Sequence, residues 1–575
     1  MANATKYNHI HYLVSMLKAY GIKNIIASPG VQNAYFNAIV QNDDYFKCYS
    51  EVDERNNAYM ALGISYETNE PVAISCTESN ASTNFLPAMR EAFYRNIPIV
   101  AITFFGTNRN EYNLSPQYAN KKSCLSDVCE IDVTLLEQFT DNEKETNLTF
   151  LNAALANAKY NHYPVHINCP SCFNFDEINN INQLPDDIWT NEFIFENFID
   201  YSTYIESKNT VIFIGSHKKF SKEEIKEISE FAEKYSTPVI CDHSSNYQGK
   251  NKILLAQYQN MINPDNYPQL IIDMGNVCGE YSIYGLFFSN AEIWHIADDF
   301  KFKSRLNRPI TKTFMCKEKQ FFKELNLYTP QNCNFYNNVK EEINKIVIPE
   351  LPLCNALIGQ YLARYIPDKS SLHIGVSNTK RSTNFTTFNN SITTNMNVGM
   401  CGIDGVLPTA IGQSFADKNR KVFAVMGDLT FFYGVNALYN RHINNNLRII
   451  LINNGRGEEM RLNERLENAY AENSDNLITA YGHHKNGAKS IANSNNFYYM
   501  RAETKEQFLT QINDFCNKEY EEPVLFEVFT NDTDEKNGLN LMQTYNKQKT
   551  PDIKYKNRNK IELAFYTLIQ QIFNW

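Results

Sequence analysis

Two polar segments in the last third of the chain combine residue types that can bind a metal ion. Gly427-Asp428 ends one apolar, strand-like run, and Asn453-Asn454 ends the next. A carboxylate, an amide oxygen and a nearby backbone carbonyl form the hard-oxygen set that suits Mg²⁺, whose shell phosphate oxygens and water complete. Taken alone, each segment is better explained as a turn that closes an ordinary strand.

The spacing of the two segments favours one shared cofactor site. Asp428 and Asn454 are about one strand–helix–strand unit apart. In a parallel sheet both strand ends reach the same edge, where ligands bind. Gly427 would let a diphosphate approach the backbone, and the amides of Leu429 and Thr430, at the start of the following helix, would bind its oxygens.

The segment YSEVDERNNAYMALG, residues 49–63, places three acids ahead of an apolar, helix-like pattern. The segment alone fits either a catalytic acid or a capped helix start. Asp53 is placed to be the N-cap of that helix. We interpret Glu51 as a strand-end or surface charge, and we expect Arg55 to pair with a carboxylate. Glu54 is the third acid, and the residue types alone do not decide whether it is catalytic.

The elements that must position these residues follow an alternating pattern. Short apolar runs alternate with amphipathic, helix-length segments such as 56–66 and 81–94. This pattern predicts an α/β fold with parallel sheets flanked by helices. The predicted strands fall into three blocks, namely 23–30, 71–77 and 97–106; then 209–216, 237–242, 268–275 and 291–298; then 371–377, 421–428 and 447–454.

The length of 575 residues predicts several domains. We place the domains at residues 1–180, 181–345 and 346–540, followed by a C-terminal helical extension at 541–575. The middle domain lacks a complete Gly-x-Gly-x-x-Gly, so we expect a structural domain without FAD or NAD.

Composition excludes several classes of function. The net charge is −10, with acids and bases interspersed, which argues against nucleic acid as the main partner. The sequence has neither an apolar run of transmembrane length nor a signal-peptide pattern at its start. The 13 cysteines lack paired zinc-site spacing and are expected to be reduced thiols. We therefore expect a cytoplasmic protein without a membrane partner.

Taken together, these segments resemble the thiamine-diphosphate (ThDP) enzymes, whose metal motif is Gly-Asp-Gly followed later by Asn-Asn. Leu429 stands at the third motif position, and Gly-Asp-Leu is typical of one branch, the menaquinone-pathway synthase MenD. That branch makes 2-succinyl-5-enolpyruvyl-6-hydroxy-3-cyclohexene-1-carboxylate. Further segments resemble the family in the same order along residues 8–545, namely ASPGVQNA (27–34), VDERNNAYMALG (52–63), GIDGVLPTAIG (402–412) and TNDTDE (530–535).

The resemblance implies a pyrimidine-binding domain, a middle domain and a diphosphate-binding domain. It also implies a homodimer or homotetramer in which each ThDP lies between the pyrimidine domain of one subunit and the diphosphate domain of another. At the positions that match the family's motifs, Glu54 would hydrogen-bond a nitrogen of the pyrimidine ring, and Ile403 would support the bent cofactor. Asp428, Asn454 and the carbonyl of Arg456 would bind Mg²⁺.

The substrate residues of the family are only partly retained. By match, Gln117 is an active-site glutamine and Arg381 is one of the arginines that bind carboxylated substrates. Bidentate arginine contacts are strong and specific, so their loss changes what the site can bind. The positions that depart from the family's arginine-containing segments hold Val31, Gln32, Gly106 and Val398.

These residues predict a ThDP- and Mg²⁺-dependent carboligase. It would decarboxylate a 2-oxo acid and transfer the acyl carbanion equivalent to an acceptor other than isochorismate, with Arg381 and Gln32 near the substrate. The alternatives are a 2-oxo acid decarboxylase that releases an aldehyde, a genuine MenD-type synthase, and a non-catalytic homologue. His483-His484 fits an exposed loop better than a catalytic lid, and His373 is expected to be structural.

Overall fold

The computed structural model describes most of the chain between residues 8 and 546. The residues in that span that it does not describe are 79, 107–123, 139, 172–182, 189, 191–200, 262–266, 281–282, 288–290, 299–309, 332, 458, 460–461, 463–478, 480–481 and 483–486.

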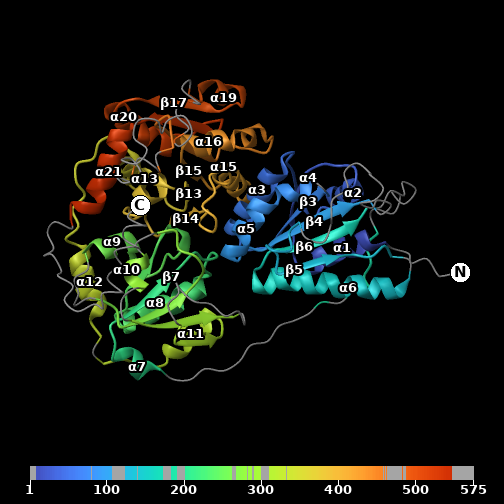
Figure 1. Cartoon of the computed structure of the whole chain (residues 1–575), viewed down its shortest axis with the longest axis horizontal. Helices are drawn as coiled ribbons and strands as arrows, with labels where there is room; N and C mark the ends of the chain where they lie inside the picture. The colour runs from blue at the N-terminus through green and yellow to red at the C-terminus, as the bar shows by residue number, and fades with distance from the viewer. Residues whose placement is uncertain are drawn as a thin grey trace. The chain divides into compact units, whose positions relative to one another are not determined.

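The first sheet has six parallel strands in the order β2-β1-β3-β4-β6-β5 (Figure 1). Its strands β3, β4 and β6 are buried along almost their whole length, as expected for a parallel sheet that is covered on both faces. The strands are β1 (Asn24–Ala27), β2 (Lys47–Ser50), β3 (Val72–Thr77), β4 (Ile99–Phe105), β5 (Ile131–Thr134) and β6 (Val165–Pro170). Helix α1 (His9–Ala19) precedes the first strand. The helices between the strands are α2 (Ala34–Gln41), α3 (Glu54–Thr68), α4 (Asn80–Asn84), α5 (Leu86–Arg95) and α6 (Asp141–Ala156).

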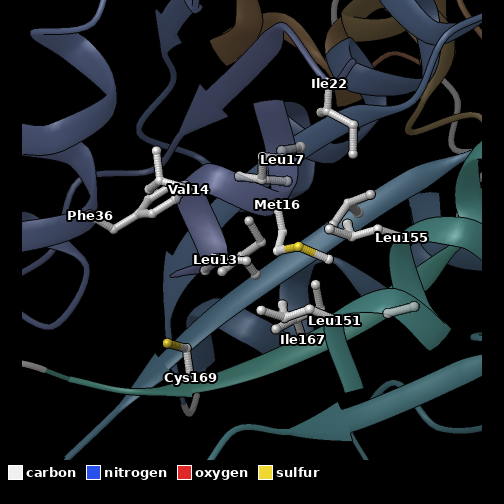
Figure 2. Close-up of a cluster of buried hydrophobic side chains, with 14 of the residues drawn as sticks. Leu13, Val14, Met16, Leu17, Ile22, Phe36, Leu151, Leu155, Ile167 and Cys169 are labelled. Atoms are coloured by element: carbon white, nitrogen blue, oxygen red, sulfur yellow. The ribbon is translucent and has the colours of Figure 1, made fainter. Parts of the chain in front are cut away.

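The apolar core beside this sheet is formed in large part by α1 and α6. Figure 2 shows Leu13, Met16 and Leu17 of α1 in the same cluster as Leu151 and Leu155 of α6. All five side chains are fully buried. Burial of this kind, repeated over the cluster, supplies the main driving force for folding.

The second sheet has the order β12-β11-β10-β7-β8-β9, again with parallel strands. The strand order reverses between β7 and β10, where open α/β sheets can form a ligand crevice. At the ends of β7 and β10, the Gly215 amide donates to the Met274 carbonyl, and the Ser216 amide donates to the Val277 carbonyl. The absence of FAD or NAD stays a prediction. The strands are β7 (Thr210–Ile214), β8 (Val239–Cys241), β9 (Lys252–Leu254), β10 (Leu270–Met274), β11 (Glu292–Ala297) and β12 (Lys312–Met315).

The third sheet has the order β14-β13-β15-β16-β18-β17, with all strands parallel. Strands β13, β15 and β16 are neighbours, so the residues that follow them gather at one edge. The strands are β13 (Ser371–Ile374), β14 (Thr393–Met396), β15 (Val422–Gly427), β16 (Leu447–Asn453), β17 (Tyr498–Ala502) and β18 (Val524–Phe529). The helices that the site uses are α13 (Asn355–Tyr365), α14 (Asn378–Thr383), α16 (Asp428–Tyr433) and α21 (Asp532–Thr544).

The chain forms two compact units, and each contains segments that are distant in sequence. The first comprises residues 1–195, 404–419 and 434–444, and the second comprises 196–403, 420–433 and 445–575. The first unit therefore holds α15 (Val406–Ala416) and the 3₁₀ helix η6 (Val435–Tyr439) in addition to the first sheet.

Within the first unit, α3 and α15 cross at very close range. A Cβ atom at Gly63 would lie 2.1 Å from the carbonyl oxygen of Thr409. A Cβ atom at Gly412 would lie 2.2 Å from the carbonyl oxygen of Met60. Glycine on both helices is therefore required for this approach. The crossing fixes the position of α3, the helix that begins at Glu54.

The predicted α/β class with three parallel sheets is confirmed, while the exact domain boundaries stay predictions. The predicted helix at 81–94 is divided into α4 and α5, which begins at Leu86 with Pro87 in its first turn. Most of the predicted extension at 541–575 lies outside the described residues. None of the described helices is long and apolar enough to span a membrane.

Candidate active site

The carboxyl edge of the third sheet brings the two predicted metal-binding segments together. Asp428 follows the last residue of β15, and its carboxylate is only 3% exposed. One oxygen accepts a hydrogen bond from the Leu429 amide at 2.7 Å, and the other accepts one from the Gly455 amide at 2.7 Å. The second bond links the end of β15 to the loop after β16. Asp428 is thus positioned by backbone donors from both halves of the motif.

The two asparagines at the end of β16 have different surroundings. Asn453 is buried and donates from Nδ2 to Glu527 of β18 at 2.8 Å. Asn454 is half-buried, and its Oδ1 accepts from the Arg456 amide at 3.2 Å. Asn453 therefore joins neighbouring strands, while Asn454 remains close to the loop that carries the Arg456 carbonyl.

The backbone beside these residues leaves room for a ligand. A Cβ atom built at Gly427 or at Gly455 would meet no heavy atom within 4 Å. Asp428 and Asn454 supply oxygen atoms of the kind that Mg²⁺ prefers, and each oxygen has capacity beyond its present hydrogen bond. The residues present therefore fit a metal-bound diphosphate.

The residues after Asp428 match the expected diphosphate site only in part. Leu429 is half-buried and Thr430 is buried, both in the first turn of α16. The Leu429 amide donates to Asp428, so it is already engaged within the protein. The roles of Leu429 and Thr430 in binding a diphosphate stay predictions.

Arg381 lies on α14, which begins where β13 ends at the same edge. The turn before α14 places Ser377 at a φ of 57°, a conformation that side chains other than glycine rarely adopt. Arg381 is 4% exposed and donates from Nη2 to the carboxylate of Glu459. Arg456, also at this edge, pairs with Asp532 at 3.4 Å.

A buried acid holds α14 in place from behind. Glu535 on α21 is 1% exposed and accepts hydrogen bonds from Asn378 Nδ2 at 2.9 Å and from the Asn355 amide at 3.1 Å. Burial raises the pKa of Glu535, and these amide donors oppose that rise. Asn378 is the first residue of α14, so Glu535 positions the helix that carries Arg381.

In the first unit, Glu54 begins α3 as predicted from its segment. Asp53 is the N-cap, because its side chain accepts from the amides of Arg55 at 2.9 Å and Asn56 at 3.2 Å. Arg55 lies 3.9 Å from the Asp53 carboxylate, as expected for a weak ion pair. Glu54 is half-buried. Burial raises the pKa of the Cys76 thiol near the end of β3, and the negative charge of Glu54 adds to that rise.

Glu51 lies at the end of a strand, which is one of its two interpretations, but it is not a surface charge. It directly follows β2 but is only 7% exposed. Its carboxylate accepts from Asn440 Nδ2 at 2.5 Å and from the Asp53 amide at 3.3 Å. Burial raises the pKa of Glu51, while these two hydrogen bonds oppose the rise. The burial of Glu51 was not predicted, because Asn440 lies far away in sequence and no local pattern indicates that it covers this strand end.

Glu51 and Glu54 line the same cavity in the first unit. Its volume is about 800 Å³. The chain around α3 forms one wall and the segment around η6 forms another. The residues that line it are Ser50, Glu51, Val52, Asp53, Glu54, Arg55, Asn84, Asn436, Tyr439, Asn440 and Arg441. The polar residues contributed by the η6 segment were not predicted, since their sequence carries no recognisable motif.

The remaining predicted residues are distributed over both units. Gln32 lies in the turn between β1 and α2 and is 7% exposed, and its Oε1 has no hydrogen-bond partner among the described residues. Ile403 is half-buried in the turn that precedes α15. His373 is fully buried within β13, in agreement with a structural role. Gln117 and His483-His484 lie outside the described residues.

Two family models match the chain at the segments that carry these residues. Residues 8–123 match the N-terminal thiamine pyrophosphate-binding domain of thiamine pyrophosphate enzymes, and residues 375–528 match the C-terminal one. The chain belongs to the thiamine-diphosphate enzymes and carries both of their cofactor-binding domains.

Similar proteins agree with the branch that the motifs indicated. A 2-succinyl-5-enolpyruvyl-6-hydroxy-3-cyclohexene-1-carboxylate synthase of Bacteroides fragilis is 28% identical over 550 residues, covering 91% of this chain and 96% of the relative. The enzyme of the same name from Phocaeicola vulgatus is 26% identical over 562 residues, covering 93% and 97%. The predicted resemblance to MenD is confirmed.

A solved structure supports the fold independently. The thiamine diphosphate-dependent 4-hydroxybenzoylformate decarboxylase of Rhodococcus jostii RHA1 superposes with a TM-score of 0.68 at 17% identity. The alignment covers 91% of this chain and 99% of that structure. At this level of identity the comparison supports the architecture of three domains with parallel sheets.

Proposed function

We propose that the protein is a ThDP- and Mg²⁺-dependent carboligase. It decarboxylates a 2-oxo acid and transfers the acyl group, as a carbanion equivalent, to an acceptor other than isochorismate. The observation that carries this proposal is the position of Asp428, whose buried carboxylate joins the end of β15 to the loop after β16. That arrangement brings both halves of a metal-binding motif to one sheet edge.

The residues at that edge hold the cofactor in this proposal. Asp428, Asn454 and the carbonyl of Arg456 bind Mg²⁺, which in turn holds the diphosphate. Ile403 supports the cofactor from beneath. When bound, ThDP supplies the electron sink that lets a 2-oxo acid lose CO₂.

Glu54 acts at the opposite end of the cofactor. Its carboxyl group holds a proton at a ring nitrogen of the aminopyrimidine, which favours the tautomer that the reaction needs. The helix start supports this role, because Asp53 takes the capping function and leaves the Glu54 side chain available. Within the described part of the chain, the Glu54 carboxylate accepts no hydrogen bond from a protein donor.

The acceptor is the part of the reaction in which this chain departs from its relatives. Val398 is apolar and 4% exposed at a position where the resemblance expects an arginine. Gln32 likewise replaces a charged residue in its turn. An acceptor with several carboxylates would lose charge-assisted contacts at both positions. A genuine MenD-type synthase is the second candidate, because relatives of that name align along more than 90% of the chain.

We further propose a homodimer or homotetramer with active sites at subunit interfaces. Val52 and Tyr439 both line the Glu54 cavity and are 81% and 69% exposed. Large apolar side chains beside a functional cavity are typical of surfaces that another subunit covers. A second subunit would then supply the Asp428 half of the site.

The test is a panel of 2-oxo acids incubated with the protein, ThDP and Mg²⁺. We expect CO₂ release, and mass spectrometry should find a carboligation product when a suitable acceptor is present. An aldehyde as the sole product with every acceptor would favour a simple decarboxylase. Formation of the MenD product from isochorismate and 2-oxoglutarate would contradict our exclusion of isochorismate.

The substitution Glu54→Gln tests the catalytic role directly. We expect turnover to fall by at least about 100-fold, as is typical when a residue in proton transfer is lost. ThDP binding, measured by calorimetry, should be largely retained. Glu70→Gln, an exposed acid of the same unit, is the matched control. Undiminished turnover in Glu54→Gln would refute the role of Glu54.

A further inference from the structure

Arg381 matches one of the arginines that bind substrate in the family. In the structure it pairs with an acid of the same chain. The guanidinium Nη2 donates to Oε1 of Glu459. The Arg381 side chain is 5% exposed and that of Glu459 is 26% exposed. Glu459 lies in the segment after β16, five residues beyond Asn454. The pair therefore joins the loops that follow β13 and β16.

Burial makes this pair different from an ordinary surface ion pair. A buried guanidinium needs a carboxylate partner, because removal of one partner leaves an uncompensated charge in a poorly solvated position. A carboxylate on a substrate would compete with Glu459 for this guanidinium, because Glu459 already accepts from Nη2. A displaced Glu459 would lose its own partner.

The other basic side chains described at this edge are Arg456 and Lys380, which is buried on α14 and lies 4.0 Å from Cys401 Sγ. Arg456 pairs with Asp532 at 3.4 Å. Val398 contributes only apolar atoms. Both arginines that the structure describes after β13 and β16 are thus matched by carboxylates of the protein.

We propose that Glu459 is a specificity residue that restricts the donor to 2-oxo acids without a second carboxylate. This inference rests on the proposed function and on the family resemblance, which places Arg381 near the substrate. A monocarboxylic donor leaves the Arg381–Glu459 pair intact and places its uncharged side chain beside it. A dicarboxylic donor, such as 2-oxoglutarate, must compete with Glu459 for Arg381.

The substitution Glu459→Gln tests this inference in the full-length protein loaded with ThDP and Mg²⁺. The readout is the ratio of kcat/KM for 2-oxoglutarate to that for 2-oxopentanoate, which has the same chain length without the second carboxylate. Wild type should favour 2-oxopentanoate. Glu459→Gln frees the charge of Arg381, and the ratio should rise by about tenfold or more, as expected for a new charge-assisted hydrogen bond.

Binding provides a second readout that does not depend on turnover. Calorimetry should show glutarate binding to Glu459→Gln at least about tenfold more tightly than to wild type, with pentanoate unchanged. The matched control is Glu503→Gln, which removes the acid of the exposed Arg501–Glu503 pair in the same unit. That control should alter neither the ratio nor glutarate binding.

A charge-neutral double variant covers the case in which Glu459→Gln does not fold. Arg381→Leu combined with Glu459→Leu replaces the buried pair by apolar groups, an exchange that proteins often tolerate. We expect it to keep the wild-type preference for 2-oxopentanoate. Selective loss of 2-oxopentanoate turnover would contradict the inference, because Arg381 would then be binding the donor itself.

The outcomes separate this inference from the proposed function. Turnover of 2-oxo acids with an unchanged ratio and unchanged glutarate binding in Glu459→Gln overturns the role of Glu459 alone. A wild-type preference for 2-oxoglutarate overturns it as well. Absence of turnover with every 2-oxo acid, together with tighter glutarate binding in the variant, overturns the proposed reaction but supports the role of Glu459.

Discussion

Glu51 and Glu54 are three residues apart, yet the fold treats their side chains differently. Glu51 is buried against the η6 segment and bonded to Asn440, whereas Glu54 is half-buried at the start of α3. Burial raises the pKa of Glu51. The folded protein therefore binds more protons at this group than the unfolded chain does, between the ordinary pKa of a glutamate and the raised one.

This proton uptake predicts a pH-dependent effect of Glu51→Gln on stability. The contribution of Glu51 to stability is full below its ordinary pKa and is lost as the pH rises through its raised pKa. The neutral amide does not titrate, so the melting temperature of the variant should improve relative to that of wild type as the pH rises from 4.5 to 8. Thermal unfolding at both pH values is the measurement. Glu521→Gln, at an exposed position, should show no such trend.

At the residue scale, local chemistry was predictable and distant partners were not. Asp53 as an N-cap follows from the residues beside it, because capping bonds reach only two or three residues along the chain. The burial of Glu51 and the pairing of Arg381 depend on Asn440 and Glu459, which are 389 and 78 residues away. No periodicity or motif in one sequence encodes contacts of that length.

At the scale of elements, the crossing of α3 and α15 depends on the absence of side chains. Gly63→Ala would place a methyl group 2.1 Å from the carbonyl oxygen of Thr409. The helices would have to move apart, at a cost of about 1–3 kcal/mol, as is typical for overpacking. Denaturant unfolding should show the lower stability. ThDP affinity should also fall, because α3 begins at Glu54.

A second helical glycine provides the control for this prediction. Gly359 lies within α13, and an added Cβ would be 3.5 Å from its nearest neighbour, an ordinary contact. Gly359→Ala should therefore be neutral or stabilising, by up to about 1 kcal/mol, through its higher helix propensity. Equal destabilisation by both substitutions would mean that the crossing is not the cause.

Apolar runs predicted only part of the set of strands, because β2, β5, β6, β9, β12, β14, β17 and β18 were not predicted. Each predicted strand corresponds to a strand of the fold, because buried parallel strands appear as short, continuous apolar runs. The pairing of α3 with α15, which starts more than 330 residues later, was not predictable. Its two glycines acquire meaning only when both helices are seen together.

At the scale of the whole molecule, the proposed subunit interface should cover the exposed apolar residues at the Glu54 cavity. Val52→Lys would bury a charge in that interface and should convert the assembly into a species near the 66.5 kDa mass of one chain. Light scattering after size-exclusion chromatography measures the mass, and turnover should fall with it.

Leu327→Lys is the control for that experiment, because Leu327 is also highly exposed but lies in the other unit. Its mass and activity should match those of wild type. A wild-type protein that is fully active as a monomer would contradict the proposed arrangement of active sites between subunits.

The division of the chain into two units has a consequence for how the protein can be altered by recombination or truncation. The polypeptide passes from one unit to the other five times, at residues 195, 403, 419, 433 and 444. Cutting the gene at any one of these points leaves fragments in which at least one unit lacks a piece of its own chain. The helix that supports α3 is encoded within the stretch that otherwise encodes the third sheet. Exchange of the cofactor-binding halves between related genes would therefore succeed only as an exchange of nearly the whole coding sequence.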